Sequence, residues 1–306
     1  MKIKVRVPSS TANLGPGFDV FGAALSLYNE FEVEYVSNAK KTKFIIKGEG
    51  KRSLSIGEKS LLWQSMQEAF KVLGTTKYSL NNLNIVINNN IPLSGGLGSS
   101  STAIVGGVML ANALCSNKLD KSQIAELAIK IEGHPDNVVP AIFGGICICS
   151  KNEDEEEHGT VVNLPIPKLK VVLCVPSFEL RTKRSREILP KMIDMKDAVF
   201  NISRVALLTA AFCCADYSLL KQATQDRLHQ PYRGKMNPAM NKVLQAALGA
   251  KSFGAFLSGA GPTLAAFCSK KDAVNVQNTM ENAWKKERVS VKSYILDFDV
   301  KGAMIV

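Results

Sequence analysis

A glycine- and serine-rich stretch between an expected strand and a long apolar helix constrains the fold more than any other part of the sequence. The strand covers residues 83–87, the stretch covers residues 92–101, and the helix covers about residues 100–114. Glycines let main-chain amides approach an anion without a Cβ in the way, and the amino end of a helix adds a positive dipole. The pattern therefore predicts a phosphate-binding loop, with a loop that merely caps the helix as the alternative.

The hydroxyl groups of this loop extend the prediction to a nucleotide and a metal ion. Ser99, Ser100 and Ser101 can contact phosphate oxygens or a hydrated Mg²⁺, a cation that prefers oxygen ligands. The stretch lacks both the Lys-Ser/Thr ending of the Walker loop and the Gly-x-Gly-x-x-Gly of dinucleotide-binding folds. It therefore indicates a phosphate site outside those two classes.

Apolar spacing and turn residues predict a mixed succession of strands and helices. Further strands are expected at residues 2–7, 30–36, 43–47, 146–149 and 171–175, and further helices at residues 60–73, 120–133, within 196–228, and at 237–248. Two more strands flank the glycine turn at residues 258–261, and a helix and a strand follow it. Antiparallel hairpins mixed with strand–helix units favour the α+β class over a doubly wound parallel sheet.

The length of the chain and a change in its pattern predict two domains. A chain of 306 residues exceeds the commonest size of one domain, and the pattern changes beyond Pro165. We therefore expect an N-terminal domain over residues 1–165 and a C-terminal domain over residues 166–306. The acidic run at residues 152–157 is expected to be an exposed hairpin tip without chemistry.

Composition excludes several classes of protein. Hydrophobic residues make up 46% and charged residues 21%, as in globular proteins, and no window approaches the roughly 18 apolar residues of a membrane span. The net charge of +11 comes from scattered lysines and only 7% of residues are aromatic, so we expect no nucleic-acid partner. The first residues alternate as a strand does and lack a secretion signal, which favours the cytoplasm. The seven cysteines lie mostly in apolar runs and are expected to be buried, reduced thiols.

Three ordered motifs resemble those of the GHMP kinases. The loop reads Pro-x-Ser-x-Gly-Leu-Gly-Ser-Ser, which is similar to the family's central nucleotide-binding motif, and residues 8–19 and 257–263 resemble its first and third motifs. The resemblance extends over essentially the whole chain. It implies ATP and Mg²⁺ as cofactors, and a fold with an N-terminal ribosomal-S5-domain-2-like domain and a C-terminal ferredoxin-like domain.

Four segments resemble the homoserine kinases more than the mevalonate, galactose or shikimate kinases of the family. They are residues 11–19, 132–141, 186–190 and 231–235. The resemblance implies ATP-dependent phosphorylation of L-homoserine to O-phospho-L-homoserine, with release of ADP, in threonine biosynthesis. A GHMP kinase for a different small alcohol and a catalytically silent binding protein are the alternatives. Dimers are common in the family, so a homodimer is possible for this chain. Inhibition by threonine is an open hypothesis.

A zwitterionic substrate requires side chains of both charges. Arg186 and Arg233 offer planar forks for a carboxylate or for phosphate oxygens, and Asp19 offers an acceptor for an ammonium group. A surface ion pair for either arginine and a structural role for His134 are the alternatives from the residues alone. By resemblance, the substrate site comprises Asn13, Asp19, His134, Asn137, Arg186, Arg233 and Gly259. The nucleotide loop comprises Pro92, Leu93, Ser94, Gly95, Gly96, Leu97, Gly98, Ser99, Ser100, Ser101 and Thr102.

The resemblance also assigns the metal site and the catalytic groups. Glu132 with Ser100 is expected to hold Mg²⁺, and Thr182, Arg186 and Asn137 are the expected catalytic residues. Asn137 and Ser10 stand where other GHMP kinases have an aspartate base and a lysine. We therefore expect the substrate hydroxyl to lose its proton without a dedicated base, either to the γ-phosphate or through Thr182. Ser101 and Thr102, which replace the usual alanines, are expected to affect helix packing, and the adenine pocket is left unassigned.

Overall fold

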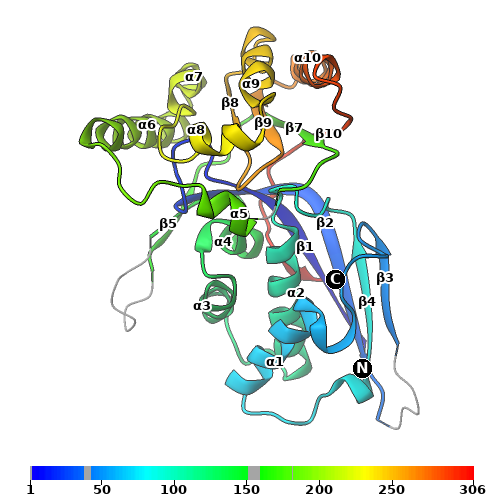
Figure 1. Ribbon diagram of the computed structural model, residues 1–306. Helices are drawn as coiled ribbons and strands as arrows, with labels where there is room; N and C mark the ends of the chain where they lie inside the picture. Colours follow the sequence, from blue (N-terminus) through cyan, green and yellow to red (C-terminus); the bar gives the residue numbers. More distant parts are fainter. Residues whose placement is uncertain (1, 38–42, 151–158, 181) are drawn as a thin grey trace.

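Two sheets organise the computed structural model, which describes residues 2–37, 43–150, 159–180 and 182–306 (Figure 1). The larger sheet has the strand order β11-β1-β2-β4-β3, and β5 pairs with both β2 and β6. Its strands are β1 (Lys2–Ala12), β2 (Phe21–Tyr35), β3 (Phe44–Gly48), β4 (Leu83–Asn89), β5 (Ile146–Cys149), β6 (Val161–Leu164) and β11 (Met304–Ile305). The pairs within it are antiparallel except for β3 and β4, which run parallel.

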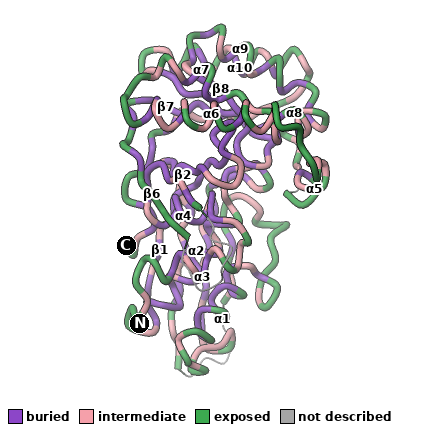
Figure 2. Tube along the Cα trace, turned by 90° about the vertical axis from the view of Figure 1, so that its left-hand side faces the viewer, coloured by how far each residue is buried: buried purple, intermediate pink, exposed green. Residues whose placement is uncertain are grey.

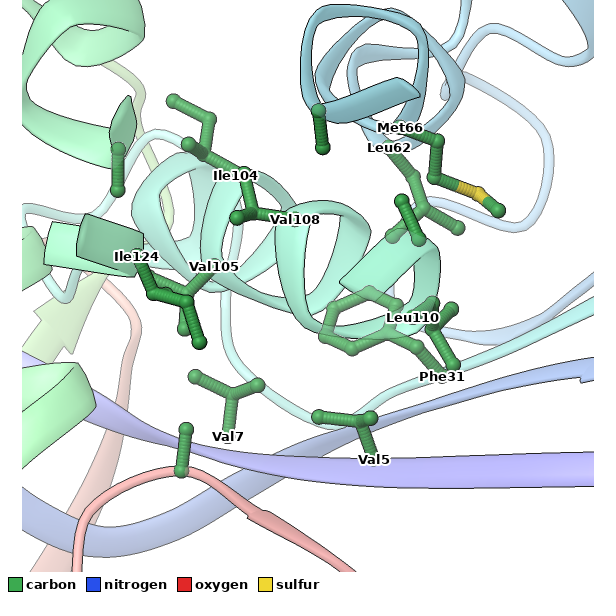
Figure 3. Close-up of a cluster of buried hydrophobic side chains, with 14 of the residues drawn as sticks. Val5, Val7, Phe31, Leu62, Met66, Ile104, Val105, Val108, Leu110 and Ile124 are labelled. Atoms are coloured by element: carbon green, nitrogen blue, oxygen red, sulfur yellow. The ribbon is translucent and has the colours of Figure 1, made fainter. Parts of the chain in front are cut away.

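Four helices pack on one face of this sheet and enclose its core. They are α1 (Leu61–Val72), α2 (Ser99–Leu114), α3 (Lys121–Glu132) and α4 (Pro135–Phe143). Helix α2 lies in the centre, with Val105 and Val108 among the buried residues that face the sheet and the other helices (Figure 3). A Cβ at Gly106 would come within 2.4 Å of the Phe31 ring, so glycine allows the helix to approach β2 closely.

The second sheet, of order β10-β7-β9-β8, is antiparallel and carries most of the later helices. Its strands are β7 (Lys170–Pro176), β8 (Gly254–Leu257), β9 (Leu264–Cys268) and β10 (Val291–Leu296). The helices are α5 (Thr182–Glu187), α6 (Met195–Cys213), α7 (Leu220–Ala223), α8 (Gln230–Arg233), α9 (Met240–Gly249) and α10 (Ala273–Lys286). One hydrophobic cluster joins both halves of the molecule, because it includes Leu14 and Leu97 together with Leu173. Figure 2 shows the buried chain continuing across this junction, with α5 largely exposed at the edge.

The predicted α+β class is confirmed, and so are most of the predicted elements. Asp120 caps α3 as expected, since its side chain accepts a hydrogen bond from the Gln123 amide at 2.9 Å. The domain boundary near residue 165 stays a prediction, and the acidic run at residues 152–157 lies outside the described residues. Helix α4 was missed, although Pro135 at its first turn is a helix-starting signal.

The expectation that the cysteines are buried is confirmed for only some of the seven. Cys147, Cys149, Cys174 and Cys268 are buried, and burial raises the pKa of Cys147 to about 12, so this thiol stays protonated. The expectation was wrong for Cys213 and Cys214, which are exposed at the end of α6. In the described part of the chain, no helix has the length and apolar character needed to cross a bilayer.

Candidate active site

Most of the expected phosphate loop and all of the expected substrate residues line one cavity of about 300 Å³ at the junction of the two sheets. Six segments meet there: the β1–β2 turn, the loop before α2, the α3–α4 junction, α5, α8 and the β8–β9 turn. The lining residues are Asn13, Asp19, Pro92, Ser94, Gly95, Gly96, Leu97, Gly98, Ser99, Ser100, Ser101, Glu132, His134, Asp136, Asn137, Thr182, Arg186, Arg233, Gly259 and Ala260.

The glycines of the loop allow the other two motifs to pack directly against it. Gly96 and Gly98 have φ of 74° and 68°, which disfavours other residues, and α2 begins directly after Gly98. A Cβ at Gly96 would lie 2.2 Å from the Ser258 carbonyl oxygen, and one at Gly98 would lie 2.1 Å from Ser10 Oγ. The main-chain amide of Ser10 donates to the Leu97 carbonyl at 3.2 Å. The loop is therefore held from both sides by the first and third motifs.

Alanine at Gly96 should destabilise the protein, whereas alanine at the neighbouring Gly95 should not. A Cβ at Gly95 meets its nearest atoms at 3.5 Å, which is ordinary contact. We expect Gly96→Ala to lower the free energy of unfolding by about 2 kcal/mol or more, and Gly95→Ala by less than about 1 kcal/mol. Urea unfolding of the two variants checks this. Equal losses would contradict the packing of the β8–β9 turn on Gly96.

Glu132, the last residue of α3, points its carboxylate at the first turn of α2. Its Oε1 accepts a hydrogen bond from Ser101 Oγ at 2.8 Å, and Ser101 is buried. Burial raises the pKa of the Glu132 carboxyl, although the Ser101 hydroxyl opposes that shift. Ser101 was expected in the nucleotide loop, with its hydroxyl available to phosphate or Mg²⁺, and the structure places this hydroxyl against the expected metal carboxylate. Ser100 lines the same cavity as Glu132.

A chain of hydrogen bonds runs through the α3–α4 junction beneath the cavity. His134 Nδ1 lies 2.6 Å from Asp136 Oδ1, Asn137 Nδ2 donates to the same oxygen at 3.3 Å, and Ser10 Oγ donates to Asn137 Oδ1 at 2.9 Å. Burial would lower the pKa of His134, but the Asp136 carboxylate outweighs it, so the pKa of this imidazole is raised. The contact between His134 and Asp136 therefore fixes the carboxylate oxygen that Asn137 binds and holds Asn137 in place.

Asp19 and Arg186 form a two-point ion pair at the mouth of the cavity. Arg186 NH1 donates to Asp19 Oδ2 at 2.8 Å and NH2 donates to Oδ1 at 2.7 Å. Burial would raise the pKa of Asp19, but the Arg186 guanidinium lowers it overall. Asn13 orients this turn, because its Oδ1 accepts from the Asp19 amide at 3.1 Å and its Nδ2 donates to the Gly259 carbonyl at 2.9 Å. Both charges needed for a zwitterion are thus present at one place.

A second cavity of about 320 Å³ adjoins the first along the loop. The two share Ser94, Ser99 and Ser100, and the second also contains Leu93, Ser60 and Leu61. Its other lining residues are Asn29, Phe31, Ile46, Leu54, Ser55, Lys59, Leu62, Ile87, Asn89 and Ala103. The loop therefore separates a polar chamber from a more apolar one.

Sequence reasoning placed some residues differently from the structure. Thr102 lines neither cavity: it is buried, donates to the Ser99 carbonyl at 2.8 Å and accepts from Asn29 Nδ2 at 2.8 Å. Asp136 was left out of the predicted site, although its place between His134 and Asn137 was a signal. His229 was also missed. Its signal is the spacing of four residues to Arg233, which brings two side chains together at the start of a helix.

Comparisons with known proteins agree with this architecture. The model of the GHMP kinases N terminal domain matches residues 61–145, and that of the GHMP kinases C terminal domain matches residues 208–286. The homoserine kinase of Desulfitobacterium hafniense is 40% identical over 304 residues, covering 99% of this chain and 100% of the relative. That of Caldicellulosiruptor saccharolyticus is 42% identical over 307 residues, covering 99% and 96%.

A solved structure extends the agreement to three dimensions. The crystal structure of homoserine kinase from Cytophaga hutchinsonii superposes with a TM-score of 0.89 at 29% sequence identity, covering 100% of this chain and 97% of that one. Family models match both halves, and the relatives align over nearly their full length. This chain therefore belongs to the GHMP kinase family.

Proposed function

We propose that this chain is a homoserine kinase, which transfers the γ-phosphoryl group of ATP to the hydroxyl of L-homoserine. The products are O-phospho-L-homoserine and ADP, and the reaction serves threonine biosynthesis. The full-length relatives that carry this name support the proposal. The observation that carries it is the placement of Arg186, Arg233 and Asp19 around one polar cavity that opens onto the glycine loop.

The charges of the cavity favour an amino acid over a sugar or an isoprenoid alcohol. The carboxylate of homoserine suits the guanidinium groups of Arg186 and Arg233, and its ammonium group suits the Asp19 carboxylate. A neutral polyol would bring no carboxylate to Arg233 and no charged group to the pair of Asp19 and Arg186. Thr182 and Asn137 also line the cavity, which fits the catalytic roles expected for them.

The two adjoining cavities suggest how ATP lies. We place the adenine in the more apolar chamber near Ser60 and Leu61, and the phosphates along the loop at Ser94, Ser99 and Ser100, which line both chambers. The amino end of α2 then faces the phosphate charge. This arrangement directs the γ-phosphate into the chamber that contains Thr182. Thr102, which lines neither chamber, receives no role in nucleotide binding.

The residues present fit a magnesium ion. Glu132 supplies a half-buried carboxylate, Ser100 supplies a hydroxyl in the same cavity, and both offer the oxygen donors that Mg²⁺ prefers. Within the described residues, histidine, cysteine and acidic side chains form no cluster of three that could hold an ion alone. Phosphate oxygens would therefore complete the coordination. When bound, the ion neutralises charge on the β- and γ-phosphates during transfer.

The three carboxylates that line the cavity already have partners, which supports transfer without a dedicated base. Asp19 pairs with Arg186, Glu132 accepts from Ser101, and Asp136 pairs with His134. The substrate hydroxyl then loses its proton to the γ-phosphate or through Thr182, as predicted. Arg186 contributes positive charge to the cavity, and the raised pKa of His134 favours the charged form of that imidazole. The protein acts mainly by positioning the two substrates.

Replacing Asp136 by asparagine should therefore lower kcat by less than about 10², because the residue orients its neighbours and does not accept the proton. The amide can keep one hydrogen bond to Asn137 or to His134. Steady-state kinetics with homoserine at saturating Mg-ATP measures the effect. A loss of about 10³ in kcat at unchanged KM would contradict this and make Asp136 the base.

Release of ADP from Mg-ATP by the purified protein tests the proposed function directly. L-homoserine, mevalonate, shikimate and galactose are compared at equal concentrations. Turnover with homoserine alone supports the proposal, and turnover with another alcohol replaces the substrate while keeping the nucleotide site. No turnover with any of them would indicate a silent binding protein. The cytoplasmic location, the homodimer and the lack of a nucleic-acid partner stay predictions.

A further inference from the structure

We propose that His229 is a positioning residue, which as a neutral imidazole with its proton on Nε2 orients Arg233 toward the carboxylate of the substrate. The inference rests on the proposed function, because it takes Arg233 as a carboxylate ligand. His229 is fully buried and lines neither of the two cavities. It therefore acts on the substrate only through its neighbour.

The contacts of His229 leave one arrangement of its proton. Arg233 NH1 lies 3.1 Å from His229 Nδ1, and because a guanidinium can only donate, Nδ1 must accept. On the other side of the ring, Nε2 lies 2.6 Å from the Gly15 carbonyl oxygen, which can only accept, so Nε2 must donate. Asp226 Oδ2, at 3.5 Å from Nε2, also faces the nitrogen that carries the proton. The ring is thus fixed as the neutral Nε2–H tautomer.

Protonation of His229 would break this arrangement. A second ring proton would place an N–H against the N–H of Arg233, and two positive charges would meet in a fully buried place. Burial accordingly lowers the pKa of His229, with Arg233 adding to the effect and Asp226 opposing it. The pKa of Arg233 is lowered to about 10, chiefly by burial, so the guanidinium still carries its charge at neutral pH.

His229 completes a set of contacts that fixes the plane of the guanidinium. Arg233 Nε donates to the Ser185 carbonyl at 3.2 Å, and NH1 donates to the Gly259 carbonyl at 3.0 Å as well as to His229. Phe18 packs beside both groups: its ring centroid lies 5.4 Å from that of the His229 ring and 5.2 Å from Cζ of the Arg233 guanidinium. Among the described residues, the hydrogen bonds of Arg233 come from Nε and NH1, which leaves NH2 for the substrate.

Two substitutions of His229 test the roles of its two ring nitrogens separately. In His229→Asn the amide oxygen can take the place of Nδ1 and still accept from Arg233, whereas the contact with Gly15 is lost. In His229→Gln the amide nitrogen can take the place of Nε2 and still donate to Gly15, whereas the acceptor for Arg233 is lost. The pair therefore distinguishes positioning of Arg233 from general support of the β1–β2 turn.

We expect His229→Gln to raise the KM for homoserine about tenfold, which is the usual effect of one lost hydrogen bond to a charged group. His229→Asn should raise it by less than about threefold, and both variants should keep the KM for Mg-ATP within about twofold. Equal KM values for homoserine in the two variants, or a larger effect in His229→Asn, would overturn the proposal. Absence of homoserine turnover in the unsubstituted protein would instead overturn the proposed function.

If either variant fails to fold, the tautomer of His229 can be measured directly in a protein that keeps this histidine. The sequence contains three histidines, so ¹⁵N NMR of labelled protein with His134 and His158 replaced by glutamine reports His229 alone. We expect the signals of a neutral Nε2–H tautomer that does not titrate between about pH 6 and 9. A ring that titrates in this range, or one that carries its proton on Nδ1, would overturn the proposal.

Discussion

Replacing Glu132 by glutamine will lower kcat by about 10³ and will at the same time raise the melting temperature of the protein free of nucleotide. The loss of activity follows because an amide supplies no negative charge to Mg²⁺, and one electrostatic partner of the transition state is worth on the order of 10²–10³. The KM for homoserine should change little. Steady-state kinetics over a range of Mg²⁺ concentrations measures the loss.

The gain in stability follows from the burial of the carboxylate. Burial raises the pKa of Glu132 above its ordinary value, so the folded state keeps this proton to a higher pH than the unfolded state does. Stability therefore falls as the pH rises from the unfolded pKa through the folded pKa, and it stays lower above both. Glutamine removes this penalty. The rise in Tm should be present at neutral pH and should vanish below about pH 4, where glutamate is protonated in both states.

Ser101→Ala is the matched control for Glu132→Gln. It removes the hydrogen bond to the carboxylate at 2.8 Å but keeps the charge, so kcat should fall by less than about tenfold. The Tm should also fall, because the Ser101 hydroxyl favours the charged carboxylate, which would lose a buried partner. If Glu132→Gln and Ser101→Ala had equal effects on kcat, the charge of Glu132 would not be needed, and the proposed magnesium site would be wrong.

Local sequence patterns predicted the glycine loop because the residues that determine its conformation are adjacent in the chain. The glycines at positions 96 and 98 each require a positive φ, and α2 begins directly after them, as the pattern of strand, loop and helix indicated. Glu132 was placed correctly at the end of its helix for the same reason, since Gly133 follows in the left-handed region that ends helices. Loop conformations and helix ends of this kind depend on residues that are adjacent in the chain, so the sequence alone can predict them.

Contacts between distant segments could not be predicted in the same way. Ser101 meets Glu132 across 31 positions of sequence, and His229 meets the Gly15 carbonyl across 214. No local pattern signals these approaches. The first depends on how α2 and α3 pack together on the larger sheet, and the second depends on how the two sheets pack through their shared hydrophobic cluster. The length of β1 was underestimated for a related reason: residues 8–12 are all buried and lose the alternation that marked the first half of the strand.

Removing the Asp19 carboxylate should abolish most of the preference for an amino-acid substrate. The test compares L-homoserine with 4-hydroxybutyrate, which has the same hydroxyl and carboxylate but no ammonium group. In the unsubstituted protein, 4-hydroxybutyrate brings no ammonium group to Asp19, so kcat/KM should favour homoserine by about 10³. In Asp19→Ala the ratio should fall to about 10 or less, because homoserine loses its ammonium acceptor while the analogue loses nothing.

The loss of preference in Asp19→Ala should be smaller than it would be at a fully buried site, because the pair of Asp19 and Arg186 is partly exposed. Asp19 and Arg186 keep 33% and 36% of their side-chain surface exposed, so water weakens every charge interaction at this place. Freed from Asp19, Arg186 can also bind the carboxylate of either substrate more strongly. Arg186→Met is the complementary control: it should lower kcat/KM for both substrates together and leave their ratio within about threefold. An unchanged ratio in Asp19→Ala would show that the ammonium group is bound elsewhere.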